Sequence, residues 1–576
     1  MTKKWLLWPF IQDELKNQFP EISPSILQLL YNRGLRTQKD IDEFLLPDYS
    51  QDLHDPYLLL DMRKAVERIW QAVKKQEKVI IYGDFDADGI TSTALLYKTL
   101  LALGLKASTY LPSRDKEGYS LNAEIVEKFT NEKMALIITC DCGIASYELV
   151  NHAQKQGIDV IITDHHREPE ILPDAYAIIN PHLKREKYPF KDLAGVGVAF
   201  KLAQALFRSE DCSIKNKESV EKWLLDLVAV GTIADLMPLM QENRTLVKYG
   251  LLVLNKTRNH GLKFLIEKCN LILGDINSGH IGFQISPRLN AAGRISHPNE
   301  ALKLILAEEH EAEDLANKLD DLNETRQRII EKSFEKLKSK LNSLATLENI
   351  IVELVEDCPI GALGLVANKI SGFYSRPAVI LARGENNIRG SGRSLNKAFD
   401  LHGFLSSFSG HFESFGGHRA AVGFSLKDEK NYENFKKDLE QKASQIMNQD
   451  ELCPEVKIDA LVQLKDADWN LYEELTKFEP YGIGNLKPLF LCQNIPLKKI
   501  EVVGHSSQHY RLLAEGGKRF IYFSPEQNMN QYKVGDRVDI VFDLSVNQWN
   551  GEQTLNFKVI DLKLHQTNNF NFLFNV

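Results

Sequence analysis

Three short runs of apolar, mostly β-branched residues stand out in the first third of the chain. They are Val79-Ile80-Ile81, Leu136-Ile137-Ile138 and Val160-Ile161-Ile162. Runs of this kind are typical of strands that are buried on both faces of a parallel sheet. Helical patterns lie before and between them, over residues 62–74, 91–103 and 146–156. Strands alternating with helices predict an α/β fold with a parallel sheet and right-handed crossovers.

Side chains that bind metals follow each apolar run. The segments are Asp84-Phe85-Asp86-Ala87-Asp88-Gly89, Cys140-Asp141-Cys142-Gly143 and Thr163-Asp164-His165-His166, and a fourth, Gly231-Thr232-Ile233-Ala234-Asp235, also ends in an acid. The carboxyl ends of neighbouring parallel strands lie on one edge of a sheet, where active sites of open α/β folds form. A single Asp after a strand is more often a helix N-cap or a turn residue. Four such segments in one chain instead favour one shared site.

So many carboxylates at one edge imply bound cations. Five or six acids without cations between them would repel one another strongly. Oxygen ligands with one or two imidazoles suit Mn²⁺ or Mg²⁺. Two such ions about 3.5–4 Å apart stabilise the attacking and leaving oxygens of a phosphoester displacement. The pattern therefore predicts a two-metal site for phosphoester chemistry.

The middle of the chain predicts a long helix and a second α/β unit. Residues 298–344 carry an irregular apolar stripe among charges. This stripe fits a connecting helix that packs on its flanking domains; an intermolecular coiled coil is the alternative, although the heptad pattern breaks at Arg326. Apolar runs then resume at Ile350-Ile351-Val352 and Ala378-Val379-Ile380-Leu381.

Two glycine-containing segments follow in this second unit. We interpret Arg389-Gly390-Ser391-Gly392-Arg393-Ser394 as a glycine-rich turn whose backbone N–H groups and two arginines bind phosphate, with a surface hairpin turn as the alternative. Gly416-Gly417-His418 is by default another glycine turn.

The last part of the chain predicts short strands. They cover residues 456–458, 500–503, 510–513, 520–523, 538–542 and 555–559, and Asn550-Gly551 is a strong hairpin signal. This pattern suits a small barrel of the oligonucleotide-binding (OB) type. Tyr522, Phe523 and Trp549 would stack on bases there, or else serve as core residues.

Composition narrows the class of protein. The seven cysteines, an odd number without CxxC pairs, fit a reduced cytosolic protein, and Cys140 and Cys142 are expected as small buried residues rather than zinc ligands. No segment reads as a signal peptide or a membrane span, which predicts a soluble cytoplasmic protein. The net charge of −8 neither supports nor excludes a DNA substrate.

Together these segments resemble the RecJ branch of the DHH phosphoesterase superfamily. The resemblance runs from Arg33-Gly34 to the C-terminal strands. It rests on residues 83–92, 141–143, 164–166, 230–239, 287–294, 416–418 and 480–485, although Leu486 stands where the family usually has proline. The implied domains are an N-terminal extension (1–52), a DHH catalytic domain (53–298), a connecting helix (299–345), a DHH-associated domain (346–450), an OB-type domain (451–567) and a tail (568–576).

The resemblance also implies residue roles. The implied metal ligands are Asp84, Asp86, Asp88, Asp141, His165 and Asp235, with Asp141 bridging two Mn²⁺ or Mg²⁺ ions. The implied catalytic residues are Asp141 and His166, the latter contacting the scissile phosphate as donor or acid. The implied substrate-binding residues are Arg114, Arg288, Arg294, Ser391, Arg393 and His418. Arg288 and Arg294 are expected in a glycine-bearing loop, and Arg114, Ser391 and Arg393 at the positions that hold the 5′ end.

The implied function is a metal-dependent exonuclease of DNA repair and recombination. It would degrade single-stranded DNA from the 5′ end to mononucleotides. The alternatives are a smaller-substrate DHH phosphodiesterase for short oligonucleotides or cyclic dinucleotides, and a non-catalytic DNA-binding replication scaffold. The predicted C-terminal barrel argues against the first, and the filled ligand positions argue against the second. The expected partners are single-stranded DNA, a single-strand-binding protein and a helicase; a monomer without membrane contact is expected.

Overall fold

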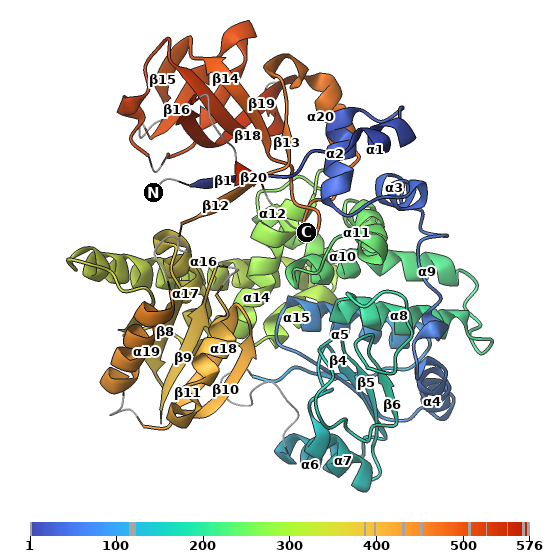
Figure 1. Cartoon of the computed structure of the whole chain (residues 1–576). Coiled ribbons are helices and arrows are strands. Elements are labelled where there is room, and N and C mark those ends of the chain that lie inside the picture. Colours follow the sequence, from blue (N-terminus) through green and yellow to red (C-terminus); the bar gives the residue numbers. More distant parts are fainter. Residues whose placement is uncertain are drawn as a thin grey trace. The chain divides into compact units, whose positions relative to one another are not determined.

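The three predicted apolar strands form the centre of a five-stranded, fully parallel sheet (Figure 1). The strands are β2 (Val79–Gly83), β3 (Ser108–Tyr110), β4 (Leu136–Cys140), β5 (Asp159–Thr163) and β6 (Ala177–Ile179), in the order β3-β2-β4-β5-β6. Gly83, Cys140, Thr163 and Ile179 form one row across the sheet. The residues that follow this row therefore start at the same edge. The strand order reverses between β2 and β4, a switch point of the kind that hosts ligands in α/β sheets.

Helices cover both faces of this sheet. α4 (Met62–Lys75), α5 (Ala87–Ala102) and α8 (Gly195–Arg208) pack on one face, and α6 (Ala123–Asn131) and α7 (Tyr147–Lys155) on the other. Because successive strand residues point to opposite faces, Ile161 joins the first core while Ile162 joins the second. The predicted parallel-sheet α/β domain and its helices are confirmed.

Mostly helical structure follows the sheet along the chain. Its elements are α9 (Lys217–Trp223), α10 (Leu225–Ala234), α11 (Gln241–Leu254), α12 (His260–Lys268), α13 (Ser278–His280), the π-helix η2 (Ile281–Ile285) and α14 (Ser286–Ile295). A short 3-10 helix, η1 (Pro56–Leu58), precedes α4. The loop predicted to carry Arg288 and Arg294 is wrong, because this segment is helix α14. Pro287 lies in its first turn, where proline is favourable. Gly293 does not mark a loop: a Cβ atom there would lie 2.6 Å from the backbone oxygen of Phe85.

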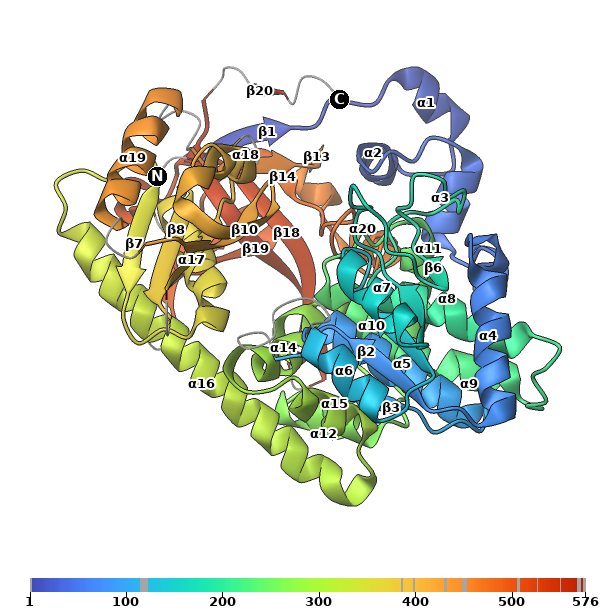
Figure 2. The same ribbon diagram turned by 90° about the horizontal axis from the view of Figure 1, so that it is seen from below.

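The predicted connecting helix is two helices, α15 (Asn299–Leu306) and α16 (Glu309–Asn342), because Ala307 and Glu308 have extended backbone. Figure 2 shows the length of α16. Its first half packs on α12, α14 and α15, and its second half on α17 and β7. Leu319 accordingly belongs to one core, and Phe334 and Leu337 to another. The interpretation as a connecting helix packed on its flanks is confirmed.

The second α/β unit has a mixed five-stranded sheet in the order β10-β11-β9-β8-β7. Its elements are β7 (Ile351–Val355), α17 (Ile360–Tyr374), β8 (Ala378–Arg383), β9 (Ile388–Arg393), α18 (Leu401–Ser406), η3 (Ser409–His411), β10 (Phe412–His418), β11 (Ala421–Leu426) and α19 (Tyr432–Ile446). The glycine-rich turn predicted at residues 389–394 is wrong, because residues 389–393 lie in strand β9 in the middle of the sheet. A Cβ atom at Gly390 would lie 2.2 Å from the Phe424 ring, so the glycine makes room for packing. Gly416 and Gly417 likewise lie in a strand, β10, just before its last residue.

The chain divides into two compact units: a central unit, Asp48–Glu451, and a terminal unit that joins Met1–Pro47 to Leu452–Val576. In the terminal unit β1 (Lys4–Leu7) pairs with β12 (Glu455–Ile458) and with β20 (Asn571–Phe572). Its other N-terminal elements are α1 (Asp13–Gln18), α2 (Pro24–Asn32) and α3 (Gln38–Leu45).

A seven-stranded sheet in the order β13-β14-β18-β19-β17-β16-β15 makes up most of the terminal unit. Its elements are β13 (Ala460–Leu461), η6 (Leu464–Asp466), α20 (Trp469–Thr476), β14 (Phe490–Pro496), β15 (Lys499–Val503), β16 (His509–Leu513), η7 (Glu515–Gly517), β17 (Arg519–Tyr522), η8 (Met529–Gln531), β18 (Arg537–Trp549) and β19 (Glu552–Leu564). Strands β18 and β19 pair up to Trp549 and Glu552, and Asn550 of the hairpin turn predicted between them lies outside the described residues. Tyr522 is buried, and Phe523, just after β17, is exposed.

The structure is a computed structural model that describes residues 3–113, 123–384, 387–396, 399–428, 432–447, 453–504, 508–525, 527–549, 551–566 and 571–572. Arg114 lies outside these ranges, and the side chain of Trp549 is likewise not described. Among the helices described, none combines the length and the apolar character that crossing a membrane requires.

Candidate metal centre and phosphate-binding residues

Acidic residues occupy the edge of the parallel sheet as predicted. Asp84, Asp141 and Asp164 directly follow the aligned ends of β2, β4 and β5. The backbone N–H of Asp141 still donates to Thr163 O, 2.9 Å away, and the chain then turns through a left-handed φ of 60° at Asp141. Its side chain is only 3% exposed. The sheet therefore carries a buried carboxylate at its switch point.

The loop between β2 and α5 holds the next two acids. Asp86 is the N-cap of α5, and its Oδ1 accepts from the backbone N–H groups of Asp88 and Gly89 at 3.0 and 3.1 Å. Asp88 is buried, and its two carboxylate oxygens accept from the N–H groups of Gly195 and Val196 at 2.7 and 2.8 Å. The N-terminus of α8 thus stabilises this anion. Asp86 thus has the ordinary role of a lone Asp after a strand, that of an N-cap. Because it lies among other acids, it is also a candidate metal ligand.

Potential ligand atoms form three overlapping groups, in each of which they lie within 4.8 Å of one another. The groups are Asp84, Asp86 and Asp141; Asp88, His165 and Asp235; and Asp141, His165 and His166. Asp235 joins from the C-terminal end of α10. The structure therefore brings together all six predicted metal ligands.

The acids of this cluster destabilise one another's charged forms. Burial and the charge of Asp86 raise the pKa of Asp88 to about 7. Burial and the charges of Asp88 and Asp86 raise the pKa of Asp235 to about 8. Burial and the neighbouring acids also raise the pKa of Asp141 well above its usual range. Bound cations would remove this cost.

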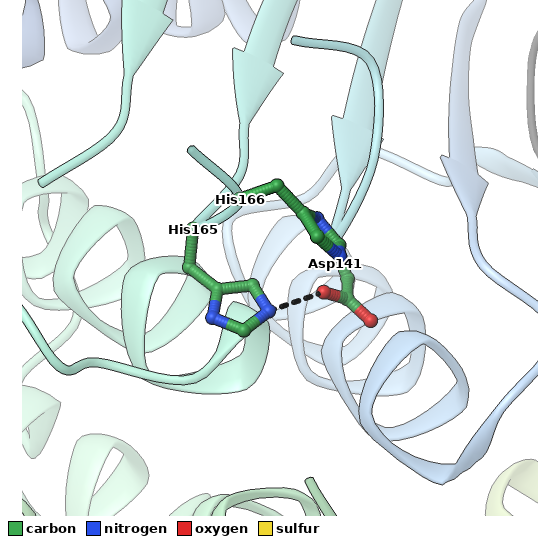
Figure 3. Close-up of side chains that lie close together, drawn as sticks. All are labelled: Asp141, His165 and His166. Carbon is green, nitrogen blue, oxygen red and sulfur yellow. Dashed lines mark ion pairs between the residues drawn. The ribbon is translucent and has the colours of Figure 1, made fainter. Parts of the chain in front are cut away.

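His165 and Asp141 face each other (Figure 3). His165 Nε2 lies 3.1 Å from Asp141 Oδ1 and 3.6 Å from Asp235 Oδ2. Burial and the neighbouring His166 lower the pKa of His165 to about 4, so its ring is neutral at pH 7. The neighbouring Leu193 backbone and the charge of Asp164 oppose this shift without cancelling it. A neutral ring protonated on Nδ1 would present the Nε2 lone pair to the acids, as a metal-ligating histidine does.

The pair fits a cation better than a hydrogen bond. Asp141 Oδ1 is buried and has no hydrogen-bond partner among the residues that the structure describes. This oxygen nevertheless lies only 3.1 Å from His165 Nε2. The surrounding donor set of carboxylates and one imidazole is the set that Mn²⁺ and Mg²⁺ prefer. The residues present thus fit two divalent ions.

His166 is oriented by Asp164. Its Nδ1 lies 2.7 Å from Asp164 Oδ1, which also accepts from the backbone N–H groups of His165 and His166 at 2.7 and 3.1 Å. The other Asp164 oxygen accepts from Ile144 N at 2.9 Å. The hydrogen bond to Asp164 raises the pKa of His166 to about 9. Asp164, to which the sequence analysis assigned no role, is thus an orienting residue.

Two further residues support the histidines. Asn180 Nδ2 donates to His166 O at 2.9 Å, and His182 Nδ1 donates to His165 O at 2.5 Å. Neither was predicted from the sequence. A signal was present for Asn180, because it directly follows the apolar strand Ala177–Ile179, just as the predicted acids follow theirs; His182 carried no such signal.

The predicted DNA-backbone arginines already bind protein groups. Arg288 Nε lies 2.8 Å from Asp320 Oδ1 in α16, and its Nη1 donates to Gln284 O at 2.9 Å. Arg294 Nη1 donates to Gly361 O at 3.0 Å, at the start of α17. Their substrate roles stay predictions.

Ser391, Arg393 and His418 lie together in the second α/β unit. Ser391 and Arg393 are two residues apart on β9 and share a face of the sheet. Arg393 Nη1 donates to Ser391 Oγ at 3.1 Å. The last residue of β10 is His418, which is exposed, and partial burial and the charge of Arg393 lower its pKa. A Cβ atom at Gly364 of α17 would lie 2.6 Å from Arg393 Nη2, so this helix packs closely on the arginine. These residues form a basic patch, whose predicted partner Arg114 lies outside the described residues.

Three protein-family models match the chain. The DHH family, N-terminal domain, matches residues 78–232, the DHHA1 domain matches residues 347–445, and the RecJ OB domain matches residues 458–561. These regions coincide with the parallel-sheet domain, the second α/β unit and the C-terminal strands.

Relatives extend the likeness to nearly the full length. The single-stranded-DNA-specific exonuclease RecJ of Bacillus subtilis is 35% identical over 558 residues, which cover 96% of this chain and 69% of that protein. The Escherichia coli protein of the same name is 32% identical over 94% of this chain and 96% of its own length.

The crystal structure of Thermus thermophilus RecJ in complex with Mn²⁺ superposes with a TM-score of 0.83 at 28% identity, covering 98% of this chain and 80% of that one. A Mg²⁺ complex of the Thermus protein gives a TM-score of 0.77 at 27% identity, over 98% of this chain and 79% of that one. On its domains, its acidic sheet edge and these relatives, the chain belongs to the RecJ family.

Proposed function

We propose that the chain hydrolyses single-stranded DNA from its 5′ end and releases mononucleotides, with two Mn²⁺ or Mg²⁺ ions as cofactors. The observation that carries this proposal is the cluster at the sheet edge, where seven residues with potential ligand atoms form groups linked through Asp141 and His165. Relatives named as single-stranded-DNA-specific exonucleases supply the substrate class. The solved RecJ complexes with Mn²⁺ and with Mg²⁺ support the choice of ions.

Asp84, Asp86, Asp88, Asp141, His165 and Asp235 would hold the ions, with Asp141 shared between them. When bound, two such ions stabilise the attacking and leaving oxygens of the displacement. Asp141 suits the shared position because it belongs to two of the three ligand groups. The N-terminus of α8 holds Asp88 in place through two backbone N–H groups. These assignments are supported by the short distances between the potential ligand atoms within each group.

His166 would contact the scissile phosphate. Its Nδ1 is occupied by Asp164, which leaves Nε2 for a phosphate oxygen or for the leaving oxygen. The side chain is 58% exposed, whereas that of His165 is 10% exposed, so only His166 is open to a substrate. This difference supports separate roles for adjacent histidines: His165 as a ligand, and His166 as a donor to the phosphate.

Ser391, Arg393 and His418, with Arg114, would bind the terminal 5′-phosphate. A planar guanidinium makes charge-assisted, bidentate contacts with phosphate oxygens. Arg393 is held on a central strand and supported by α17, so it would contact an end group from a fixed position. An exonuclease must distinguish the end of a strand from its interior. A terminal phosphate carries more charge than an internal one, so a basic patch can make this distinction.

The alternatives have less support. The match to the RecJ OB domain gives the chain a nucleic-acid-binding module that a phosphodiesterase of very small substrates would not need. A non-catalytic scaffold would not need the complete set of acids that this chain retains. A single-strand-binding protein and a helicase as partners, a monomeric state and a cytoplasmic location stay predictions.

A substrate panel tests the proposed function. Purified protein is incubated with 5′-phosphorylated single-stranded DNA, the matching duplex, single-stranded RNA and a cyclic dinucleotide, each with Mn²⁺, Mg²⁺ or EDTA. We expect metal-dependent hydrolysis that is fastest on single-stranded DNA and that stops in EDTA. Faster hydrolysis of the cyclic dinucleotide, or DNA hydrolysis that persists in EDTA, would contradict the proposal. DNA binding without any hydrolysis would favour the scaffold.

A further inference from the structure

Helix α14 reaches the loop that carries Asp86 and Asp88. The side-chain Oδ1 of Asn290, in the middle of this helix, accepts a hydrogen bond from the backbone N–H of Ala87 at 2.9 Å. Ala87 is the residue between the two acids. Because an N–H can only donate, this contact also defines which end of the Asn290 amide faces the loop.

This hydrogen bond completes the support of the loop backbone. The next two N–H groups, those of Asp88 and Gly89, both donate to Asp86 Oδ1. Ala87 itself is fully buried. Without Asn290, this buried N–H would lose its hydrogen-bond partner, and a loop in that state relaxes toward another conformation. The directions of the Asp86 and Asp88 side chains depend on this backbone.

Several contacts fix the helix that presents Asn290. Near its start, Arg288 bonds to Asp320 of α16, and near its end, Arg294 bonds to the backbone of Gly361. Gly293 allows α14 to approach the loop closely, since a Cβ atom there would lie 2.6 Å from Phe85 O. Asn290 therefore contacts the loop from a rigid support, which an orienting residue requires.

We propose that Asn290 is a positioning residue that sets the affinity of the site for divalent ions by holding the Asp86–Asp88 loop. The proposal rests on the metal site of the proposed function. Asn290 acts through its carbonyl oxygen and touches neither ion nor substrate. Residues that orient metal ligands in this indirect way typically change metal affinity about 10–100-fold when they are removed.

The chemistry of the side chain suggests a pair of variants. Asn290→Ala removes the acceptor. Asn290→Asp keeps an acceptor oxygen of the same reach, and its added negative charge would be attracted by nearby cations. The control is Asn259→Ala. Asn259 Oδ1 accepts from the backbone N–H of Leu262 as the N-cap of α12, and its Nδ2 donates to Ile305 O, so this change removes the same kind of bond, and one more, away from the acids.

The test measures Mn²⁺ binding to the full-length protein by titration calorimetry and by electron paramagnetic resonance of free Mn²⁺, with thermal unfolding in EDTA as a check of folding. We expect Asn290→Ala to weaken Mn²⁺ binding about 10-fold or more, and Asn290→Asp and Asn259→Ala to stay within about threefold of the wild type. At saturating Mn²⁺, the KM of Asn290→Ala for single-stranded DNA should be unchanged.

Two results would overturn the inference: wild-type Mn²⁺ affinity in Asn290→Ala, or equal losses in Asn290→Ala and Asn290→Asp. Because Asn290→Asp retains the acceptor, it tests the role even if Asn290→Ala fails to fold. A wild-type protein that binds no Mn²⁺ would instead contradict the proposed function, so the two failures are distinguishable.

Discussion

Asp141 is the residue on which the proposed chemistry depends most. It is buried, lies on a left-handed backbone turn at the switch point, and has its Oδ1 3.1 Å from His165 Nε2. We expect Asp141→Asn to abolish hydrolysis of single-stranded DNA, since the shared carboxylate would serve both ions. The same change should raise the unfolding temperature in EDTA, because it removes a carboxyl group whose ionised form is destabilised by burial and by the neighbouring acids. A variant that retains more than a few per cent of the wild-type rate would contradict the two-metal assignment.

The raised pKa values of the acids predict how pH affects the metal-free protein. Asp88 and Asp235, with pKa values of about 7 and about 8, bind protons in the folded state at a pH where the unfolded chain has lost them. Stability in EDTA should therefore increase as the pH falls from about 9 to about 6.5. Saturating Mn²⁺ should reduce this dependence, because the carboxylates would stay ionised. Thermal unfolding across this range provides the measurement; a slope of the opposite sign in EDTA would contradict the clustering of the acids.

The adjacent histidines should respond differently to truncation. His165→Ala should lose both Mn²⁺ binding and activity. His166→Ala should bind Mn²⁺ nearly as the wild type does but hydrolyse DNA about 10²–10⁴-fold more slowly, the usual effect of losing a positioned acid–base group. Asp164→Asn should also slow hydrolysis with little loss of Mn²⁺ binding, but by a smaller factor than His166→Ala, since it removes the anion that orients His166. Equal metal loss in the two histidine variants would show that their roles are misassigned.

At the scale of elements, glycines caused the errors of the sequence analysis. Residues 389–394 and 287–294 were predicted as a turn and a loop, yet they form strand β9 and helix α14. Glycine favours turns when its backbone freedom is used, but Gly390 and Gly293 are needed because another group lies where a side chain would be. A close approach of this kind depends on a residue distant in the sequence. The apolar runs, in contrast, predicted their strands correctly because burial on both faces requires such runs.

Strand β9 offers a direct test of this packing role. Gly390→Ala would place a Cβ atom 2.2 Å from the Phe424 ring and should lower the free energy of unfolding by about 1–3 kcal/mol. Gly423→Ala, on the paired strand β11, meets no atom within 4 Å and serves as the control. Chemical denaturation of both variants gives the comparison, and a control that is destabilised as much as Gly390→Ala would count against the packing explanation.

At the scale of the whole molecule, the sequence predicted the candidate metal ligands at the edge of the parallel sheet better than the residues that orient them. The five acids and the one histidine of the predicted metal site could be found because all but Asp235 lie in short segments directly after apolar runs, and Asp235 ends a fourth such segment. His182 and Asn290 could not be assigned roles in the same way, since each acts through a backbone contact with a residue 17 or more positions away. Such contacts exist only once the tertiary structure has formed.

The N-terminal residues show the same dependence on tertiary structure. Strand β1 lies between β12 and β20, Trp5 Nε1 donates to Asp561 Oδ2 at 2.6 Å, and Arg33 Nε donates to the buried Asn485 at 2.6 Å. Residues 1–47 thus complete the core of the C-terminal unit. Their sequence gave no sign of this, because the partners lie more than 400 residues away.

Truncation should reflect this arrangement. A fragment of residues 48–451 should fold and hydrolyse short single strands, while its binding to long ones weakens for lack of the OB domain. A fragment of residues 1–451 should aggregate, because Trp5, Leu7 and other apolar residues of the first 47 would lose their cover. Light scattering and thermal unfolding of both fragments decide this; equal solubility would contradict the shared core.

The polarity of digestion on end-labelled DNA tests the central claim most directly. Single-stranded 5′-phosphorylated DNA is labelled at the 5′ end or at the 3′ end and digested by the full-length protein with Mn²⁺, with Asp141→Asn as the control for contaminating nucleases. We predict that the 5′ label appears at once as a mononucleotide, while the 3′ label stays on progressively shorter strands and Asp141→Asn releases neither. Early release of the 3′ label, internal fragments from both substrates, or equal activity of Asp141→Asn would contradict the account.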